Sequence, residues 1–299
     1  MNVANAPVSY GVFELTIGSP GLPGPEELLA SMAESGYDGT ELGPPGFLGT
    51  GDELRERLER HGLTLAGGWI QLRLSEPEHW HDDLGAMAAT LDLFAAAGAN
   101  GVRPVLADGG SPVRMRRPGR AIHDRSVGLD ETGWRRFAGG LSRAAELSRS
   151  RGFEPVFHHH AGTYVEAPWE IERLLEISDV PLLLDTGHLA IGGGNPVEAL
   201  RDWRSRIGHL HVKDIRTSVL EKVVADRADM VEAWRRGVFC ELGAGDVDLD
   251  AFFVELASEP YNGWLVIEQD RLLEPGERID DAGAAQARNR RWLADHAGL

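Results

Sequence analysis

Short apolar runs alternate with longer amphipathic stretches along nearly the whole chain. The apolar runs end in polar or turn-forming residues, a pattern typical of strands that are covered on both faces. The clearest run is Leu182-Leu183-Leu184, which is followed by Asp185-Thr186-Gly187-His188. Eight strands are predicted, within residues 10–17, 39–42, 63–70, 101–106, 154–160, 182–188, 207–213 and 264–268.

The stretches between these strands have the spacing of helices that bury one apolar face. Helices are predicted at residues 25–35, 52–61, 79–97, 134–151, 168–177, 196–203, 250–258 and 279–297. Strands that alternate with helices indicate a parallel sheet, and eight such units indicate an α/β fold closed into a TIM (β/α)8 barrel. We expect a single domain over residues 1–299, because no linker or close repeat interrupts this alternation.

Two connections are longer than ordinary barrel loops. Residues 107–130 are rich in Gly, Pro and Arg, which suits either a functional lid or a mobile segment. Residues 217–247 form an insertion after the seventh strand, and the spacing of its apolar residues predicts one or two amphipathic helices. These apolar residues are Val219, Val223, Met230, Val231 and Trp234. The insertion is either a surface helix packed on the barrel rim, or a lid or subunit contact at the active face.

Composition narrows the class of partner. The net charge of −17 argues against nucleic acid or an anionic membrane as the main partner. Cys240 is the only cysteine, which excludes an intrachain disulfide and favours a reducing compartment. The sequence shows neither a signal peptide nor an apolar segment long enough to span a membrane. We therefore expect a soluble cytoplasmic protein whose partners are a small-molecule substrate and further copies of itself.

Polar side chains stand at the carboxyl ends of the last four predicted strands. In a barrel these ends meet at one face, where such enzymes place their chemistry. His158 or His160, Asp185, His211 and Glu268 are predicted to converge there, while His159 points to the other side of its strand. Two imidazoles and two carboxylates suit a divalent metal, with Mn²⁺ or Co²⁺ favoured and Mg²⁺, Fe²⁺ or Zn²⁺ as other choices. A structural zinc site is not expected, because the set contains no sulfur ligand.

Three motifs resemble those of the xylose isomerase-like barrel superfamily of sugar isomerases, epimerases and dehydratases. They are Asp185-Thr186-Gly187-His188, the stretch His209-Leu210-His211-Val212-Lys213-Asp214-Ile215-Arg216, and Val266-Ile267-Glu268. Within this superfamily, Phe157-His158-His159-His160-Ala161-Gly162-Thr163 is similar to the corresponding stretch of inosose dehydratases. The resemblance extends over about residues 36–268.

The resemblance implies that His158, Asp185, His211 and Glu268 are the metal ligands. It also implies one departure, because epimerases and ketose isomerases of the superfamily usually have Glu where His158 stands. An imidazole there does not suit an epimerase reaction, in which one carboxylate removes a proton from a carbon and the other returns a proton to the opposite face. It still suits a one-sided elimination, in which a base removes a proton beside a carbonyl and a β-hydroxyl leaves as water.

The expected reaction is the removal of water from a cyclic keto-polyol such as an inosose, by enolate formation at a divalent metal. In this lyase mechanism, Glu268 or His160 is the base that removes the proton. His188 or Lys213 is the acid that assists loss of the hydroxyl group. Lys213 has an alternative interpretation, as a partner in an ion pair with Asp214 or Glu268.

Three further residues are predicted to bind the substrate. Arg216 is expected to contact substrate oxygens, and Glu41 to accept a hydrogen bond from a substrate hydroxyl group. Trp69 is expected to form an apolar wall against the ring. The alternatives are a salt bridge at the barrel rim for Glu41 and packing beneath the loops for Trp69.

Other functions are compatible with parts of the pattern. A keto-sugar epimerase or isomerase, or a lyase that cleaves a 3-keto-glycoside by the same elimination, would use the same metal site. A hydrolase of abasic DNA would need more histidine ligands and a basic groove, which the net charge argues against. A metal-binding or sugar-binding protein without catalytic activity is the last alternative.

Overall fold

Eight parallel strands close into a barrel in the computed structural model, which describes residues 1–98, 101–273 and 276–299. The order around the barrel is β1-β10-β7-β6-β5-β4-β3-β2. The strands are β1 (Asn2–Asn5), β2 (Gly39–Glu41), β3 (Thr64–Leu72), β4 (Arg103–Asp108), β5 (Val156–His158), β6 (Leu182–Asp185), β7 (Ile207–Val212) and β10 (Trp264–Ile267). The predicted TIM barrel is confirmed.

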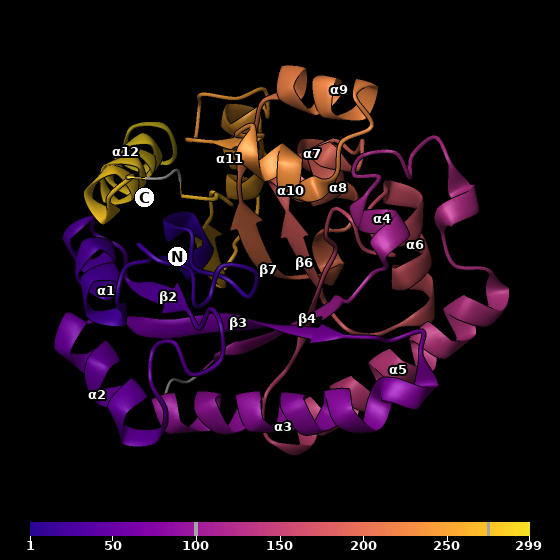
Figure 1. The fold of residues 1–299 in the computed structure, drawn as a ribbon, viewed down its shortest axis with the longest axis horizontal. Helices are drawn as coiled ribbons and strands as arrows, with labels where there is room; N and C mark the ends of the chain where they lie inside the picture. The colour runs from indigo at the N-terminus through magenta and orange to yellow at the C-terminus, as the bar shows by residue number, and fades with distance from the viewer. Residues whose placement is uncertain (99–100, 274–275) are drawn as a thin grey trace.

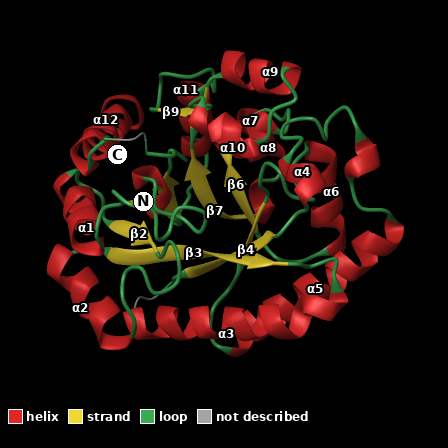
Figure 2. Ribbon diagram, viewed as in Figure 1, coloured by secondary structure: helices red, strands yellow, loops and turns green. Residues whose placement is uncertain are grey.

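Helices surround the strands as an outer layer (Figures 1 and 2). They are α1 (Pro25–Glu34), α2 (Gly51–His61), α3 (Trp80–Ala97), α5 (Glu131–Ser150), α6 (Pro168–Ile177), α8 (Pro196–Asp202), α11 (Leu249–Ala257) and α12 (Ile279–Ala297). Asp130 caps α5 by accepting a hydrogen bond from the Gly133 N–H group, at 2.7 Å. None of the helices in the described part of the chain is both long and apolar enough to cross a membrane.

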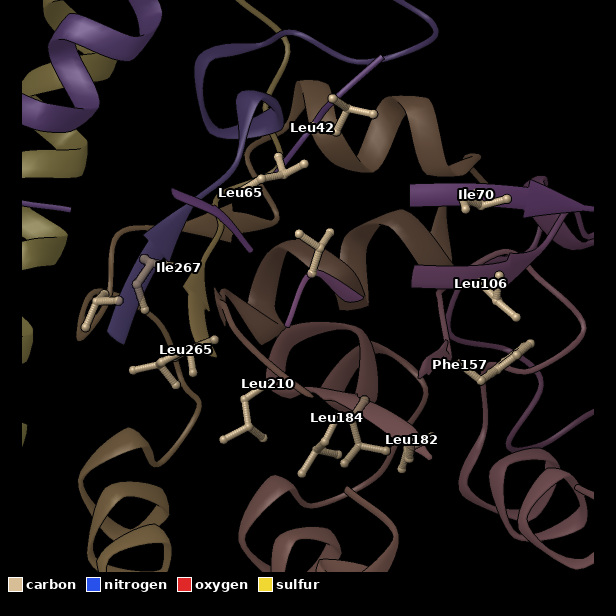
Figure 3. Packing of buried hydrophobic residues seen from close by; sticks show 14 of the residues in the cluster. Leu42, Leu65, Ile70, Leu106, Phe157, Leu182, Leu184, Leu210, Leu265 and Ile267 are labelled. Atoms are coloured by element: carbon tan, nitrogen blue, oxygen red, sulfur yellow. The ribbon is translucent and has the colours of Figure 1, made fainter. Parts of the chain in front are cut away.

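Alternation along the strands separates two regions of apolar packing. Leu182, Leu184 and Leu210 belong to the large cluster between the barrel and its helices, part of which is drawn in Figure 3. Leu183 belongs instead to a separate small cluster with Val105. Because neighbouring side chains on a strand point to opposite faces, Asp185 lies on the same face of β6 as Leu183. The side chain of Asp185 therefore points into the barrel.

The prediction of a strand at residues 10–17 is wrong. The first strand is β1, and the chain then forms a short 3-10 helix at Pro7–Tyr10 followed by turns. Tyr10 and Val12 are fully buried and belong to the large apolar cluster, although this segment is not extended. Its turns are held by Thr16, whose hydroxyl donates to the Gly11 carbonyl at 2.7 Å.

The insertion after β7 contains two helices, α9 (Thr217–Ala225) and α10 (Met230–Arg235). In Figure 1, α9 lies at the upper edge and α10 lies below it. A two-stranded antiparallel sheet of β8 (Asp214–Ile215) and β9 (Phe239–Cys240) closes the insertion at its base. Two more short helices, α4 (Pro112–Met115) and α7 (Thr186–Ile191), follow β4 and β6.

Candidate metal centre and active site

The four predicted metal ligands meet at one end of the barrel. One side-chain ligand atom from each of His158, Asp185, His211 and Glu268 lies within 4.8 Å of the others. All four residues are buried. Parallel pairing explains this convergence, because Asp185 of β6 is in register with His211 of β7, and Val266 of β10 is in register with the same histidine.

Asp185 presents one carboxylate oxygen to the centre of this set. Its Oδ1 accepts a hydrogen bond from the His188 N–H group at 2.8 Å, at the start of α7. Its Oδ2 is buried and has no hydrogen-bond partner among the described residues. It lies 3.6 Å from His158 Nε2 and 3.7 Å from His211 Nδ1. The ammonium of Lys213 lies 3.4 Å from the same oxygen. A buried carboxylate oxygen without a hydrogen bond is costly unless cations lie beside it, so this oxygen suits a metal ion as a further partner.

The two histidines are oriented as metal ligands usually are. Nδ1 of His158 bonds to the carbonyl oxygen of His159, so Nδ1 carries the proton and Nε2 keeps its lone pair. Nε2 of His211 contacts Glu41 Oε1 at 3.0 Å, which leaves Nδ1 directed at Glu268 Oε2, 2.9 Å away. The nitrogens that would bind a metal, Nε2 of His158 and Nδ1 of His211, therefore face Asp185 and Glu268, and a carboxylate supports one of the two rings.

The charges of the set act strongly on one another. Burial by itself would lower the pKa of His211, but Glu268 and Glu41 outweigh burial and raise that pKa to about 10. Burial by itself would raise the pKa of Glu268, but His211 and Lys213 hold it at about 2. Burial raises the pKa of Asp185 to about 6. A divalent metal fits these oxygen and nitrogen donors, so a divalent metal site is supported by the geometry.

Lys213 is surrounded by acceptors. Its Nζ lies 2.8 Å from Glu268 Oε2, 2.7 Å from Asp270 Oδ1 and 3.0 Å from His188 Nε2. Three acceptors within 3.0 Å match the three N–H groups of an ammonium in number. The ion pair with Glu268 that was one interpretation of Lys213 is therefore present. Asp214, the other suggested partner, accepts the N–H groups of Gly243 and Gly245 instead.

The cavity above these residues has a volume of about 300 Å³. Of the predicted catalytic residues, His160, Lys213 and Glu268 line it, whereas His188 does not. His188 is fully buried, and its ring is tilted by 38° against that of His160, with centroids 3.6 Å apart. The structure therefore brings His188 beside the cavity without exposing it there.

His160 lies beyond the end of β5, where the chain has left the extended conformation. Its Nδ1 donates a hydrogen bond to the Ala161 carbonyl at 2.9 Å, so the neutral ring keeps a lone pair on Nε2. Burial, and next the charge of Lys213, lower the pKa of His160 to about 4. His159, expected to be a supporting residue, is fully buried and its Nε2 accepts the Asp185 N–H at 3.1 Å.

The three predicted substrate-binding residues divide into two groups. Glu41 and Trp69 line the cavity, and Trp69 makes edge-to-face contacts with His158 and His160, at centroid separations of 5.6 and 5.1 Å. Arg216 is exposed and does not line the cavity, and its guanidinium donates to the Gly237 carbonyl at 3.1 Å. The structure therefore does not bring Arg216 to the site.

Asp270 and Asp108 also line the cavity, and neither was predicted as a site residue. Asp270 binds Lys213 and lies 3.3 Å from His188 Nε2. Its position two residues after Glu268 was the signal that could have identified it. Asp108 ends β4 and accepts N–H groups from Gly110 and Tyr164. Burial raises the pKa of Asp108 to about 6.

The fold and the site together define a barrel enzyme class with one buried histidine and carboxylate centre at the carboxyl ends of its strands. A family model described as a xylose isomerase-like TIM barrel matches residues 29–296. The chain belongs to this family, as its motifs predicted.

Relatives and solved structures agree with this assignment. Inosose dehydratase of Geobacillus kaustophilus is 34% identical over 250 residues, covering 82% of this chain and 80% of that protein. Inosose dehydratase 2 of Bacillus cereus is 31% identical over 280 residues, covering 92% of this chain and 90% of that protein.

Two solved structures share the fold. The IolI protein with a bound zinc atom has a TM-score of 0.70 at 15% identity, with 100% of this chain and 98% of that chain covered. The probable 3-DHS dehydratase AsbF of Bacillus anthracis has a TM-score of 0.66 at 14% identity, with 98% and 99% covered.

Proposed function

We propose that this protein is a metal-dependent dehydratase that removes water from a cyclic keto-polyol of the inosose type. The observation that carries the proposal is the convergence of His158, Asp185, His211 and Glu268 around a carboxylate oxygen that has no hydrogen-bond partner among the described residues. The names of the relatives support the same enzyme class, a dehydratase.

His158, Asp185, His211 and Glu268 would hold the metal, and we favour Mn²⁺ or Co²⁺. A metal bound there would polarise a substrate carbonyl and so acidify the neighbouring C–H group. Glu41 holds the ring of His211 through its Nε2, so its primary role is to orient a ligand.

His160 is the better placed of the two bases suggested by the sequence. It lines the cavity, and its Nε2 lone pair is available because Nδ1 donates to the Ala161 carbonyl. Oε2 of Glu268, in contrast, is already in contact with Lys213 and His211. In our proposal His160 removes the proton beside the carbonyl and then returns it to the departing hydroxyl group, so that one residue serves an elimination on one face.

Lys213 supplies a fixed positive charge in this proposal. Its ammonium balances Glu268 and Asp270, and it also lies 3.4 Å from Asp185 Oδ2. Trp69 covers one side of the cavity and gives the apolar face of a sugar ring a surface to pack against.

The experiment is incubation of the purified protein with an inosose and Mn²⁺, followed by ultraviolet absorbance for the conjugated enone and by mass for the loss of water. A chelator should abolish the activity, and added Mn²⁺ or Co²⁺ should restore it. Asp185→Asn should remain folded but lose metal occupancy and activity together. Full activity in metal-free protein would overturn the proposal. Incorporation of solvent deuterium without loss of water would indicate an epimerase instead.

A further inference from the structure

The proposed reaction uses only one side of a cyclic substrate. The carbonyl carbon, the carbon that loses the proton and the carbon that loses the hydroxyl group make up half of an inosose ring. The other ring carbons also carry hydroxyl groups. Of the residues expected to bind them, Arg216 lies away from the cavity and Glu41 holds the ring of His211. The remaining hydroxyl groups therefore need other partners in the cavity.

Asp108 stands where such a partner is needed. It ends β4, lines the cavity and is only 2% exposed. Ala107, the residue before it, is in register with His158 of the neighbouring strand β5. A strand rises about 3.3 Å per residue, so the backbone of Asp108 lies about that much further toward the carboxyl end of the barrel than the level of His158. A ring whose carbonyl lies at the proposed metal position would extend in this direction.

The two carboxylate oxygens of Asp108 differ in their surroundings. Oδ2 accepts the N–H groups of Gly110 and Tyr164, at 2.7 and 3.1 Å. Oδ1 accepts no hydrogen bond from the part of the chain that the structure describes. The backbone thus fixes the carboxylate from two segments, the long connection after β4 and the loop after β5. Because Asp108 lines the cavity, Oδ1 is a preoriented acceptor for a ligand.

A hydrogen-bond donor lies beside this acceptor. Gln71 of β3 is exposed and lines the cavity, and the residue after it, Leu72, is in register with Asp108. Nε2 of Gln71 lies 3.4 Å from the position that a Cβ atom of Gly109 would occupy. The amide group of Gln71 therefore lies against the backbone of the residue that follows Asp108. A larger residue than glycine would press against this amide.

We propose that Asp108 and Gln71 bind one hydroxyl group of the substrate, on a ring carbon that takes no part in the elimination, and so determine specificity. An acceptor next to a donor matches a hydroxyl group, which both donates and accepts. An ammonium group would leave the Gln71 donor unused, and a carboxylate substituent would be repelled by Asp108. The inference rests on the proposed function, because the ring must be held at the metal centre for this hydroxyl group to reach the pair.

This role has a kinetic signature that differs from that of a residue in the chemical step. The carbon that carries the bound hydroxyl group does not react, so the contact stabilises the bound substrate and the transition state alike. Loss of the contact should therefore raise KM and leave kcat nearly unchanged. A hydrogen bond to a charged group corresponds to about a 10- to 100-fold change in kcat/KM.

The test compares an inosose with its monodeoxy analogues, each of which lacks one hydroxyl group on a carbon outside the elimination. The intact protein loaded with Mn²⁺ is assayed by the ultraviolet absorbance of the enone. The assay is run at pH 8, where Asp108 is ionised because burial raises its pKa only to about 6. We expect the wild-type protein to discriminate about 10- to 100-fold against the analogue that lacks the bound hydroxyl group.

Asp108→Asn keeps an oxygen for the N–H groups of Gly110 and Tyr164 but presents a donor to the cavity. It should lower kcat/KM for the inosose by about 10- to 100-fold, through KM, and should cause no further loss with that one analogue. Gln71→Met changes an exposed side chain, so it tests the pair without risk to folding, and the same pattern should appear with a smaller factor.

Glu14→Gln is the matched control, because it removes a carboxylate that also lines the cavity but is exposed. It should leave the preference for the inosose over the deoxy analogue as in the wild-type protein. This control separates a direct contact with Asp108 from a general loss of negative charge in the cavity. The affinity of Asp108→Asn for Mn²⁺, measured by competition with a chelating dye, should equal that of the wild-type protein.

The outcomes distinguish the two proposals. If the wild-type protein dehydrates the inosose but Asp108→Asn lowers kcat for the inosose and every analogue alike, Asp108 does not act through a substrate hydroxyl group and the inference fails. An unchanged KM or a weaker affinity for Mn²⁺ in Asp108→Asn would also overturn it, while the dehydratase would remain. If the wild-type protein dehydrates neither the inosose nor any analogue with any divalent metal, the proposed function is wrong and the inference falls with it.

Discussion

At the scale of single residues, the nitrogen of each proposed histidine ligand that is free to bind a metal is determined by the hydrogen bond at the other ring nitrogen. The carbonyl of His159 selects Nε2 of His158, and Glu41 selects Nδ1 of His211. The metal-binding state of these rings thus depends on groups that do not touch the metal position. Histidine ligands in other metal sites depend on such partners in the same way.

Glu41→Gln tests this dependence. The amide keeps the shape of the side chain and an acceptor oxygen but removes the charge that holds the His211 Nε2–H group. We expect the affinity for Mn²⁺ to fall about 10- to 100-fold, as for other outer partners of ligands. Competition with a chelating dye measures it. Glu53→Gln, on the exposed surface of α2, is the matched control. Equal affinities in all three proteins would refute the supporting role.

At the scale of elements, the long connection at residues 107–130 is held to the loop that follows β5. Arg114 is 2% exposed and donates to the Thr163 carbonyl and to Glu170, at 2.7 and 2.8 Å. Glu166 accepts the Gly119 N–H from the long connection and the Gly162 N–H from the loop. Buried polar contacts therefore join the two segments beside the cavity.

The pH dependence of stability should report this contact. Burial raises the pKa of Glu166 from 4.5 to about 7 in the folded protein. Between these values the folded state binds more protons than the unfolded state, so the free energy of unfolding falls as pH rises from about 4.5 to about 7. Below that window both states are protonated and the effect vanishes. The slope for one proton is at most about 1.4 kcal/mol per pH unit.

Glu166→Gln should remove this contribution. Urea unfolding at several pH values should show that the difference in stability between the wild-type protein and the variant changes across pH 4.5–7 in the sense just given. The exposed Glu172→Gln in α6 serves as the control. A constant difference across the window would show that Glu166 does not keep its proton in the folded state.

At the scale of the whole molecule, strands β5, β6, β7 and β10 each place one of the four proposed ligands in or directly after the strand. The unfolded chain cannot bring these positions together, so the metal should bind the folded state selectively. Saturation to about 100 times Kd then stabilises the fold by about 2.7 kcal/mol. Mn²⁺ should therefore raise Tm, and a chelator should reverse the increase.

Asp185→Asn separates this linkage from general effects of salt. The variant should keep a similar Tm without metal, since Asn can still accept the His188 N–H that caps α7. Its Tm should respond little to Mn²⁺. Calorimetry of both proteins with Mn²⁺, and with Ca²⁺ at equal ionic strength, provides the comparison. An identical rise in Tm for both proteins would place the stabilising metal elsewhere.

Sequence patterns predicted the barrel and the four converging residues for one physical reason. Side chains of a buried strand such as Leu182–Asp185 point alternately toward the helices and into the barrel. The polar residue at the end of the strand therefore points into the barrel. The same logic failed at residues 10–17, where buried Tyr10 and Val12 belong to a loop. Alternation of apolar and polar residues in the sequence alone cannot distinguish a strand from a loop whose apolar residues are also buried.

The contacts of Arg216, Asp270 and His188 could not be predicted for another reason. Each depends on where a side chain ends after the chain has left its strand. Arg216 turns outward to the Gly237 carbonyl, whereas Asp270 reaches back to Lys213. The direction of each of these side chains depends on packing between distant segments, and the local pattern of apolar and polar residues does not predict such packing.

The ammonium of Lys213 has a consequence for the number of metals. His160, His188 and Asp270 also have ligand atoms within 4.8 Å of one another, so they resemble a second metal-binding set. Lys213 Nζ lies 3.0 Å from His188 and 2.7 Å from Asp270, and its charge would repel a cation there. We therefore predict that the Lys213 side chain takes the place of a second ion and limits the centre to one metal.

Removal of that charge should change the stoichiometry. Lys213→Met keeps the length of the side chain, and we expect it to bind two Zn²⁺ ions per chain where the wild-type protein binds one, as measured by elemental analysis after gel filtration. A Lys213→Met, Asp270→Asn double variant should return to one ion. A single Zn²⁺ ion per chain in Lys213→Met would show that the charge of Lys213 does not limit the number of bound metal ions.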